Sequence, residues 1–321
     1  MPGPFQQRGR EAVVANRACE SCHPVQSEEW ASSLHHRANI EPIYVRSFAV
    51  EPLPFCTGCH APEAPGATDV SGGVSELGVG CVTCHGTIDA VLAAPTAPAS
   101  APAPHALVRD PRFATSAACG SCHEFAFPDS MYRKNVTLMQ STVHEQRAST
   151  AGEAPCATCH MPYRGGRRDH RFRSSRDPEW VRSAVNVSAR RTGSTAVELT
   201  LAPTQLGHAF PTGDLFRRLE ITVEALGPDG LVLSEGVRYL ARHFENQTNG
   251  VHAMRRLVRD DRVGLALAAP SVLVLDAGAP AEGRTIAYRV AYQRVEIPRS
   301  VDDRDATVDG EIVLAQGVLS P

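Results

Sequence analysis

All ten cysteines of this 321-residue chain stand in copies of one pattern, Cys-x-x-Cys-His. The two sulfurs of such a pattern sit about one helical turn apart, so both can form thioethers with the vinyl groups on one edge of a porphyrin. The histidine that follows can then reach the iron as its proximal ligand. We therefore expect five covalently bound haems c, each with its iron, at Cys19-Cys22-His23, Cys56-Cys59-His60, Cys81-Cys84-His85, Cys119-Cys122-His123 and Cys156-Cys159-His160.

Zinc sites, dithiol redox pairs and a disulfide framework are the competing explanations for so many cysteines. None of them requires a histidine directly after the second cysteine. Histidine makes up 13 of the 321 residues, so chance would place one after all five pairs about once in ten million trials. Haem attachment is the interpretation that explains the pattern.

The function depends on the second axial position of each iron. A haem with protein ligands on both faces is a low-spin electron carrier, whereas an open face can bind a substrate. Eight histidines lie outside the motifs, and from these we predict five distal ligands: His35, His105, His144, His170 and His208. His36 is the alternative to its neighbour, and His243 and His252 are expected to be ordinary surface residues.

Local sequence supports each of these assignments. His35 follows Trp30 in EEWASSLHHRA, and His144 occupies a similar segment, STVHEQRA. His105 precedes the fourth motif, and His170 lies ten residues after the fifth. His208 stands in GHAFPTGD, where glycine and a Pro-Thr-Gly turn would let a loop project an imidazole. Methionine could also bind iron, at Met131, Met139 or Met161, but histidines are in excess.

The motifs show a partial internal repeat. Those at Cys19 and Cys56 recur one hundred residues later, at Cys119 and Cys156. We interpret this as a duplicated two-haem unit with an extra haem between the copies. The Ala/Pro-rich residues 92–104 are expected to form an extended surface loop without packed structure.

Period-two alternation begins only after about residue 183, as in Leu219, Ile221 and Val223 on one face of a strand. We expect an α+β protein, with a helical, loop-rich pentahaem domain at 1–178 and an antiparallel β-sandwich of immunoglobulin-like type at 179–321. A barrel would give much the same pattern. GPDG is expected to be a turn, and the other expected strands are SAVNVSA, TAVELTLA, LVLSE, SVLVL, TIAYRVAYQRV and GEIVLA.

The formal charge of −3 does not indicate binding to nucleic acid. Five haems with ionised propionates would bring the charge to about −8, which favours neutral or basic partner surfaces. Haem attachment takes place outside the cytoplasm, so a periplasmic or extracellular location is expected. The first sixteen residues contain no apolar stretch, so the export signal is expected to be already removed or to lie upstream of this start. No segment is expected to span a membrane.

Taken together, the CxxCH motifs, the W-x-x-S-x-H segment at Trp30–His35 and the G-H-x-F-P-T-G segment at Gly207–Gly213 resemble one superfamily of multihaem cytochromes. It includes the tetrahaem cytochrome of ammonia oxidisers, hydroxylamine oxidoreductase and the pentahaem nitrite reductases. The resemblance covers most of residues 17–226. It implies that His35, His144 and His208 are distal haem ligands, and that the chain is a pentahaem member with a β-rich C-terminal domain.

The chain departs from the enzymes of that superfamily. The nitrite reductases mostly use a lysine in place of one motif histidine, but there is no CxxCK here and Lys134 stands in no motif. Hydroxylamine oxidoreductase has a tyrosine bonded to its catalytic haem, and nothing in the sequence marks Tyr44, Tyr132 or Tyr163 for that role. An electron carrier is therefore expected rather than an enzyme, in respiratory or extracellular electron transport with redox partner proteins such as other cytochromes.

Two other functions remain open. One is a reductase or oxidase of a small nitrogen or sulfur compound at one five-coordinate haem. The other is a structural subunit of a cytochrome filament, which would assemble with itself through the β-rich domain.

Overall fold

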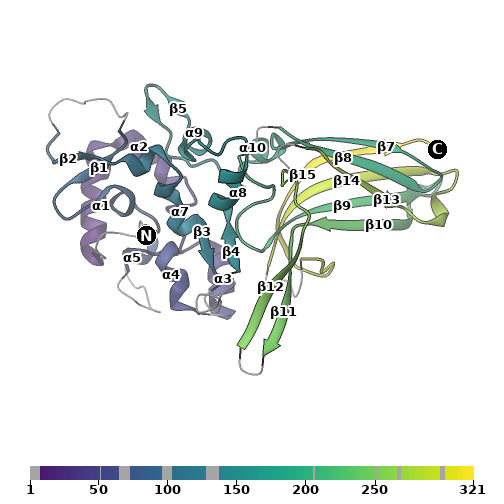
Figure 1. Ribbon diagram of the computed structural model, residues 1–321, viewed down its shortest axis with the longest axis horizontal. Helices are drawn as coiled ribbons and strands as arrows, with labels where there is room; N and C mark the ends of the chain where they lie inside the picture. The colour runs from purple at the N-terminus through teal and green to yellow at the C-terminus, as the bar shows by residue number, and fades with distance from the viewer. Residues whose placement is uncertain are drawn as a thin grey trace. The chain divides into compact units, whose positions relative to one another are not determined.

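The computed structural model describes residues 8–50, 52–64, 73–95, 103–127, 137–204, 207–249, 252–265, 269–296 and 301–321. It is an α+β protein whose contacts divide it into two compact units (Figure 1). The first comprises Met1–His123 and Glu153–Ser174, and the second comprises Glu124–Gly152 and Ser175–Pro321. The segment between the fourth and fifth motifs thus groups with the C-terminal part of the chain. A domain boundary at residue 178 stays a prediction.

In its described residues, the first unit consists of short helices, two pairs of short strands and one 3-10 turn. Its helices are α1 (Arg10–Cys22), α2 (Pro24–Ala31), α3 (Pro42–Val50), α4 (Pro54–His60), α5 (Val74–Leu77), α6 (Cys81–His85), α7 (Ala117–His123) and α9 (Ala157–His160). Strand β1 (Val91–Ala93) pairs in parallel with β2 (Leu107–Arg109), which is followed by the 3-10 turn Pro111–Ala114. Strands β5 (Tyr163–Arg164) and β6 (Arg167–Arg168) form a hairpin.

Helices of this length are marginal in isolation, so packing and covalent links must stabilise them. Proline at the first helical position begins α2 and α4, where its missing N–H is not needed. The buried hydrophobic clusters of this unit are small: one contains Ala12, Trp30, Leu77 and Val82, and the other Ala61, Ala64 and Val74. This is what we expect of a unit in which porphyrin supplies much of the apolar interior.

The second unit contains two antiparallel sheets. One has the strand order β10-β9-β14-β15 and the other β13-β8-β7. The sheet strands are β7 (Val185–Arg191), β8 (Ala196–Pro203), β9 (Arg217–Leu226), β10 (Val232–Leu240), β13 (Ser271–Asp276), β14 (Thr285–Val295) and β15 (Val308–Leu319). The unit also holds β3 (Glu124–Ala126), β4 (Leu138–Ser141), α8 (Thr142–Ala148), α10 (Pro178–Arg182) and the hairpin of β11 (Arg242–Asn249) and β12 (His252–Asp260).

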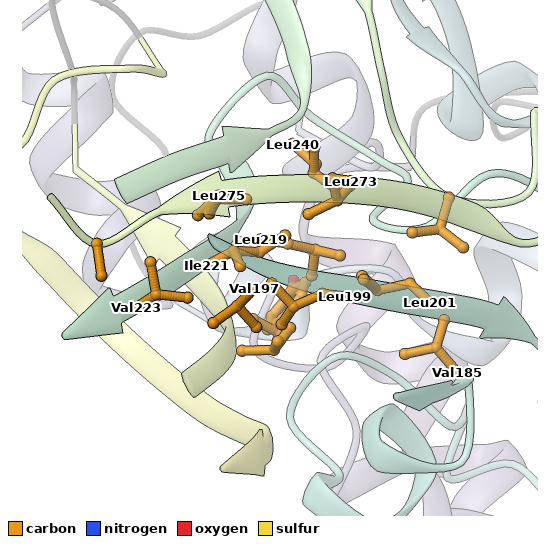
Figure 2. Packing of buried hydrophobic residues seen from close by; sticks show 14 of the residues in the cluster. Val185, Val197, Leu199, Leu201, Leu219, Ile221, Val223, Leu240, Leu273 and Leu275 are labelled. Carbon is orange, nitrogen blue, oxygen red and sulfur yellow. The ribbon is translucent and has the colours of Figure 1, made fainter. Parts of the chain in front are cut away.

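A single hydrophobic core joins the two sheets. Figure 2 shows Val197, Leu199 and Leu201 of β8 close to Leu219 and Ile221 of β9. These five side chains are 0% exposed, and they alternate with outward-facing residues along each strand. The period-two pattern in the sequence therefore identified the buried faces correctly.

All seven expected strands are present, and TIAYRVAYQRV coincides with β14. The GPDG turn is present too, closed by a 2.8 Å bond from the Gly227 N–H to the Leu231 carbonyl. The expectation for residues 92–104 was wrong at its start, because Leu92 lies in β1 and is 5% exposed. Pairing with β2 satisfies the backbone there. Residues 96–102 lie outside the described part of the chain.

Strands β11 and β12 were not expected. Their sequences, RHFENQTN and HAMRRLVRD, carry no clean alternation of apolar and polar residues. They pair with each other and with no further strand among the described residues. Within the same residues no helix has the length and apolar character needed to cross a membrane.

Candidate haem-iron sites

Each CxxCH motif forms about one turn at the end of a helix. The first closes α1, the second, third and fourth end α4, α6 and α7, and the fifth forms α9. The His23 N–H donates to the Cys19 carbonyl at 2.9 Å, and the His160 N–H donates to the Cys156 carbonyl at 3.0 Å. These i to i−4 bonds hold the two cysteines of a motif on the same side of one turn, as double attachment to a porphyrin edge requires.

Three motif histidines have the orientation of metal ligands. The Nδ1 atoms of His60, His85 and His160 lie 2.6, 2.7 and 2.7 Å from the backbone carbonyl oxygens of Ala38, Leu92 and Arg173. With Nδ1–H donating to a carbonyl, Nε2 carries the lone pair for the iron and the ring cannot rotate freely. These carbonyls fix the tautomer that axial ligation needs.

Two of the predicted distal histidines lie opposite a motif histidine. The ring centres of His35 and His123 are 6.2 Å apart, and those of His85 and His170 are 6.4 Å apart. An imidazole nitrogen lies about 1.1 Å from its ring centre and a metal–imidazole bond is about 2 Å long, so two axial rings on one iron have centres about 6 Å apart. Both pairs therefore fit a haem iron between them.

The surroundings keep these rings neutral, which is the form that binds a metal. Burial, together with the neighbouring His123 and His160, lowers the pKa of His35 to about 3. Burial also lowers the pKa of His85 and of His170 below the ordinary value for histidine. At neutral pH none of the three carries a proton that would compete with iron.

Backbone contacts position His35. The Trp30 indole N–H donates to the Val79 carbonyl at 2.8 Å, and the Val79 N–H donates to the His35 carbonyl at 2.8 Å. A Cβ at Gly78 would lie 2.4 Å from the His35 carbonyl oxygen, so only glycine allows this approach. In addition, Asn16 accepts a hydrogen bond from the Cys81 N–H at 2.7 Å and so caps α6, the helix of the third motif.

The five motifs form one connected group in the first unit. Cys59 lies next to Cys122, and Cys119 lies next to Cys156. These contacts bring the fourth motif next to both the second and the fifth. Cys19 lies near Cys81 and His23 lies near His85, so the first and third motifs are neighbours. Cys84 lies near Cys122, which makes the third and fourth motifs neighbours too.

Three aromatic side chains contact these histidines; Phe113 and Phe172 were not identified from the sequence, and Tyr44 was named there but given no role. Tyr44 stacks on His60, with ring centres 3.7 Å apart and an interplanar angle of 8°. Phe113 stacks on His85 at 5.1 Å, and Phe172 meets His35 edge to face at 4.2 Å. The buried Tyr44 hydroxyl has no hydrogen-bond partner among the described residues, which fits a site completed by a polar group of another molecule. Aromatic residues near cysteine motifs are too common to mark such contacts in advance.

The other three predicted distal ligands are His105, His144 and His208. His105 is exposed on the loop before β2. His144 lies in α8 and His208 in the GHAFPTGD loop, both in the second unit, where the Thr212 hydroxyl donates to Glu145 at 2.7 Å. The two histidines that match in the internal repeat thus lie in different units: His35 follows α2 in the first unit, and His144 lies in the second. Their roles as ligands stay predictions. Met131, Tyr132 and Lys134 lie outside the described residues.

The expectation that His243 is a surface residue was wrong. It is 4% exposed, with Nδ1 2.9 Å from Asp302 and Nε2 2.8 Å from Asp261. Arg259 packs beside it. Burial alone would lower its pKa, but the bonds to the two carboxylates raise the pKa overall. The sequence did not predict these contacts, because His243 lies in a polar strand and Asp302 comes from a distant loop.

No described His, Cys, Asp or Glu side chains form a group of three or more that could hold a metal ion by themselves.

Two comparisons with known proteins found a similarity. Residues 18–86 match the family model of cytochrome c554 and c-prime. The whole structure resembles the crystal structure of a penta-heme cytochrome c552 from Thermochromatium tepidum, with a TM-score of 0.72, covering 99% of this chain and 100% of that chain at 19% sequence identity. No curated protein matches the sequence. The chain is thus similar to a cytochrome family over residues 18–86 and to a penta-heme cytochrome in its fold, and it carries five complete CxxCH motifs of the kind that attach haem.

Proposed function

We propose that this cytochrome is an electron relay whose haems have mostly or wholly two histidine ligands. Electron transfer is the general activity of such proteins. Two pairs of opposed imidazoles support the proposal of two histidine ligands per iron. The ring centres are 6.2 Å apart in His35–His123 and 6.4 Å apart in His85–His170. An iron closed on both faces can change oxidation state but has no position free for a substrate.

The opposed rings suggest specific ligand pairs. We assign His123 and His35 to the fourth haem, and His85 and His170 to the third. His105, His144 and His208 keep the assignments made from the sequence, as the candidates for the three remaining irons. All-histidine ligation favours comparatively low potentials, as in anaerobic or respiratory electron flow.

The connected motifs support a relay rather than five independent sites. Neighbouring cysteines in the second and fourth motifs, and in the fourth and fifth, mean that the porphyrin edges attached there lie close together. Electrons can then move from haem to haem without a diffusing carrier. The fourth motif has neighbours on three sides, so the fourth haem is proposed as the junction of the relay.

We further propose an immunoglobulin-like sandwich for the β-rich part. Leaving aside the β11–β12 hairpin, the first, second and fifth strands form one sheet, and the third, fourth, sixth and seventh form the other. This order, with a shared core, is typical of that family of folds. A role in self-assembly is a separate proposal, tested by the dependence of particle size on concentration.

We also propose that the protein works outside the cytoplasm, where haem is attached to CxxCH. Its redox partners, other cytochromes among them, are expected to present neutral or basic docking surfaces. This follows from the net charge of −3, made more negative by the haem propionates.

Electron paramagnetic resonance of the oxidised holoprotein tests the ligand proposal. We expect low-spin iron throughout. His35→Ala and His170→Ala should each convert one haem to the high-spin state. His36→Ala is the matched control, because the His36 ring packs on Trp30, at 4.3 Å between ring centres, and its removal should leave the spectrum unchanged. A high-spin signal equal to one haem in the unaltered protein would support a reductase or oxidase instead.

A further inference from the structure

One short segment of the first unit touches the histidines of three haem sites. The His170 ring lies opposite His85, at 6.4 Å between centres. Two residues later, the Phe172 ring lies edge to face against His35 at 4.2 Å and against His170 at 5.9 Å. The segment 170–173 therefore begins at the third haem site and reaches the fourth.

Its last residue reaches the fifth site. The Arg173 N–H donates to the His160 carbonyl at 3.1 Å, and the Arg173 carbonyl lies 2.7 Å from His160 Nδ1. The backbone of Arg173 thus binds the backbone of the fifth motif and also orients the His160 imidazole. His160 is also close enough to His35 to contribute to the lowered pKa of His35, so the fourth and fifth sites are neighbours.

The backbone at Phe172 is unusual. Its φ is +52°, and it is the one non-glycine residue with positive φ among the described residues. A bulky side chain seldom adopts this conformation, which persists only where the surroundings impose it. A return to negative φ would turn the ring away from His35 or the Arg173 carbonyl away from His160.

Anchors on the preceding residues impose this conformation. Asp169 is 3% exposed and accepts bonds from the backbone N–H and the guanidinium of Arg171, at 2.9 and 2.6 Å. Glu29, far away in the sequence, accepts from the His170 N–H at 3.0 Å and from the Arg167 guanidinium at 2.7 Å. The start of the segment cannot shift without breaking these buried and partly buried bonds.

We propose that Phe172 is a positioning residue that sets the orientation of two axial imidazoles, those of His35 and His170, and so couples the third and fourth haems. This inference rests on the proposed ligand pairs. Because the Phe172 ring contacts both imidazoles, it would restrict the rotation of each of them when it holds an iron. The orientation of an axial imidazole affects the electronic state of a low-spin iron, so one side chain acts on two irons.

The test uses the oxidised holoprotein and its low-spin resonance signals. His35→Ala and His170→Ala first identify the signals of the fourth and third haems. Phe172→Leu removes the aromatic edge, and Phe172→Gly removes the ring while accepting the positive φ without strain. We expect both Phe172 variants to shift those two signals together and to leave the other haems unchanged. Haem content, measured by intact mass, should remain at five.

Phe113→Leu is the matched control, because Phe113 stacks on His85 and should shift the signal of the third haem alone. If the Phe172 variants lower only the thermal stability, or shift one signal or none, the positioning role is wrong while the ligand pairs stand. If His35→Ala and His170→Ala produce no high-spin haem, the ligand pairs themselves are wrong. Phe172→Tyr, which keeps the ring, should restore the original signals.

Discussion

Replacing Gly78 by alanine should disturb the fourth haem through the backbone of His35, its proposed distal ligand. Gly78 has φ of +57° and ψ of −130°. A Cβ there would lie 2.4 Å from the carbonyl oxygens of both His35 and His36. Ordinary carbon–oxygen contacts are about 3.3 Å, so the histidine turn would have to move by about 0.9 Å.

Two terms set the expected loss of stability. The strained backbone conformation costs a residue with a Cβ about 1–3 kcal/mol. Losing the bond from the Val79 N–H to the His35 carbonyl adds about 1 kcal/mol. We therefore expect Gly78→Ala to lower the free energy of unfolding by about 3 kcal/mol. A movement of about 0.9 Å is also a large fraction of a metal–imidazole bond of about 2 Å, so part of the fourth haem should turn high-spin.

Guanidinium unfolding and the high-spin resonance signal measure the two effects. Gly165→Ala is the matched control: Gly165 also has φ of +57°, in the turn of the β5–β6 hairpin, but a Cβ there would meet nothing within 4 Å. It should cost about 1–2 kcal/mol, from backbone strain alone, with no change of spin state. If the two variants behave alike in both measurements, the contact of Gly78 with the histidine turn does not position His35.

Three further outcomes are expected. The denatured protein should keep five haems, so its intact mass should exceed the polypeptide mass by five haem units; four or fewer after full maturation would contradict the motif count. His208→Ala should turn one haem high-spin and leave four unaffected, whereas an unaltered spectrum in the folded variant would move the search to His36. His243 has a raised pKa in the folded protein because Asp261 and Asp302 bond both ring nitrogens, although burial opposes this. Its contribution to stability should be complete below about pH 6.5 and fall as pH rises through the raised folded pKa, so the denaturant midpoint should fall over that range and His243→Gln should flatten the curve.

The haem count and the sheet strands were accessible from the sequence because both follow local rules. Thioether attachment needs two sulfurs one turn apart and a histidine next to them, and all five motifs satisfy this within five residues. The buried faces of β8, β9 and β14 follow from alternation along single strands. Neither inference needs to know what the other side of the molecule contains.

The β11–β12 hairpin and the buried His243 were not accessible in the same way. In the hairpin, pairing between two polar, arginine-rich segments replaces burial of one face, so periodicity gives no signal. His243 is buried because Asp302, from a distant loop, covers it, and that contact joins residues 59 positions apart. A lone histidine between charged residues is more often exposed.

The distal sites show the same division between local and long-range information. His35 and His170 could be nominated as spare histidines near the motifs, but which motif each one opposes depends on how α2, α6, α7 and the 170–173 segment pack. Phe172 was not named from the sequence and Tyr44 was given no role, since an aromatic residue becomes part of a haem site only when the fold brings it to a histidine. Covalent attachment is encoded over five consecutive residues, whereas the proposed axial pairs join residues about 85 to 88 positions apart, and only the packed chain decides which imidazoles meet.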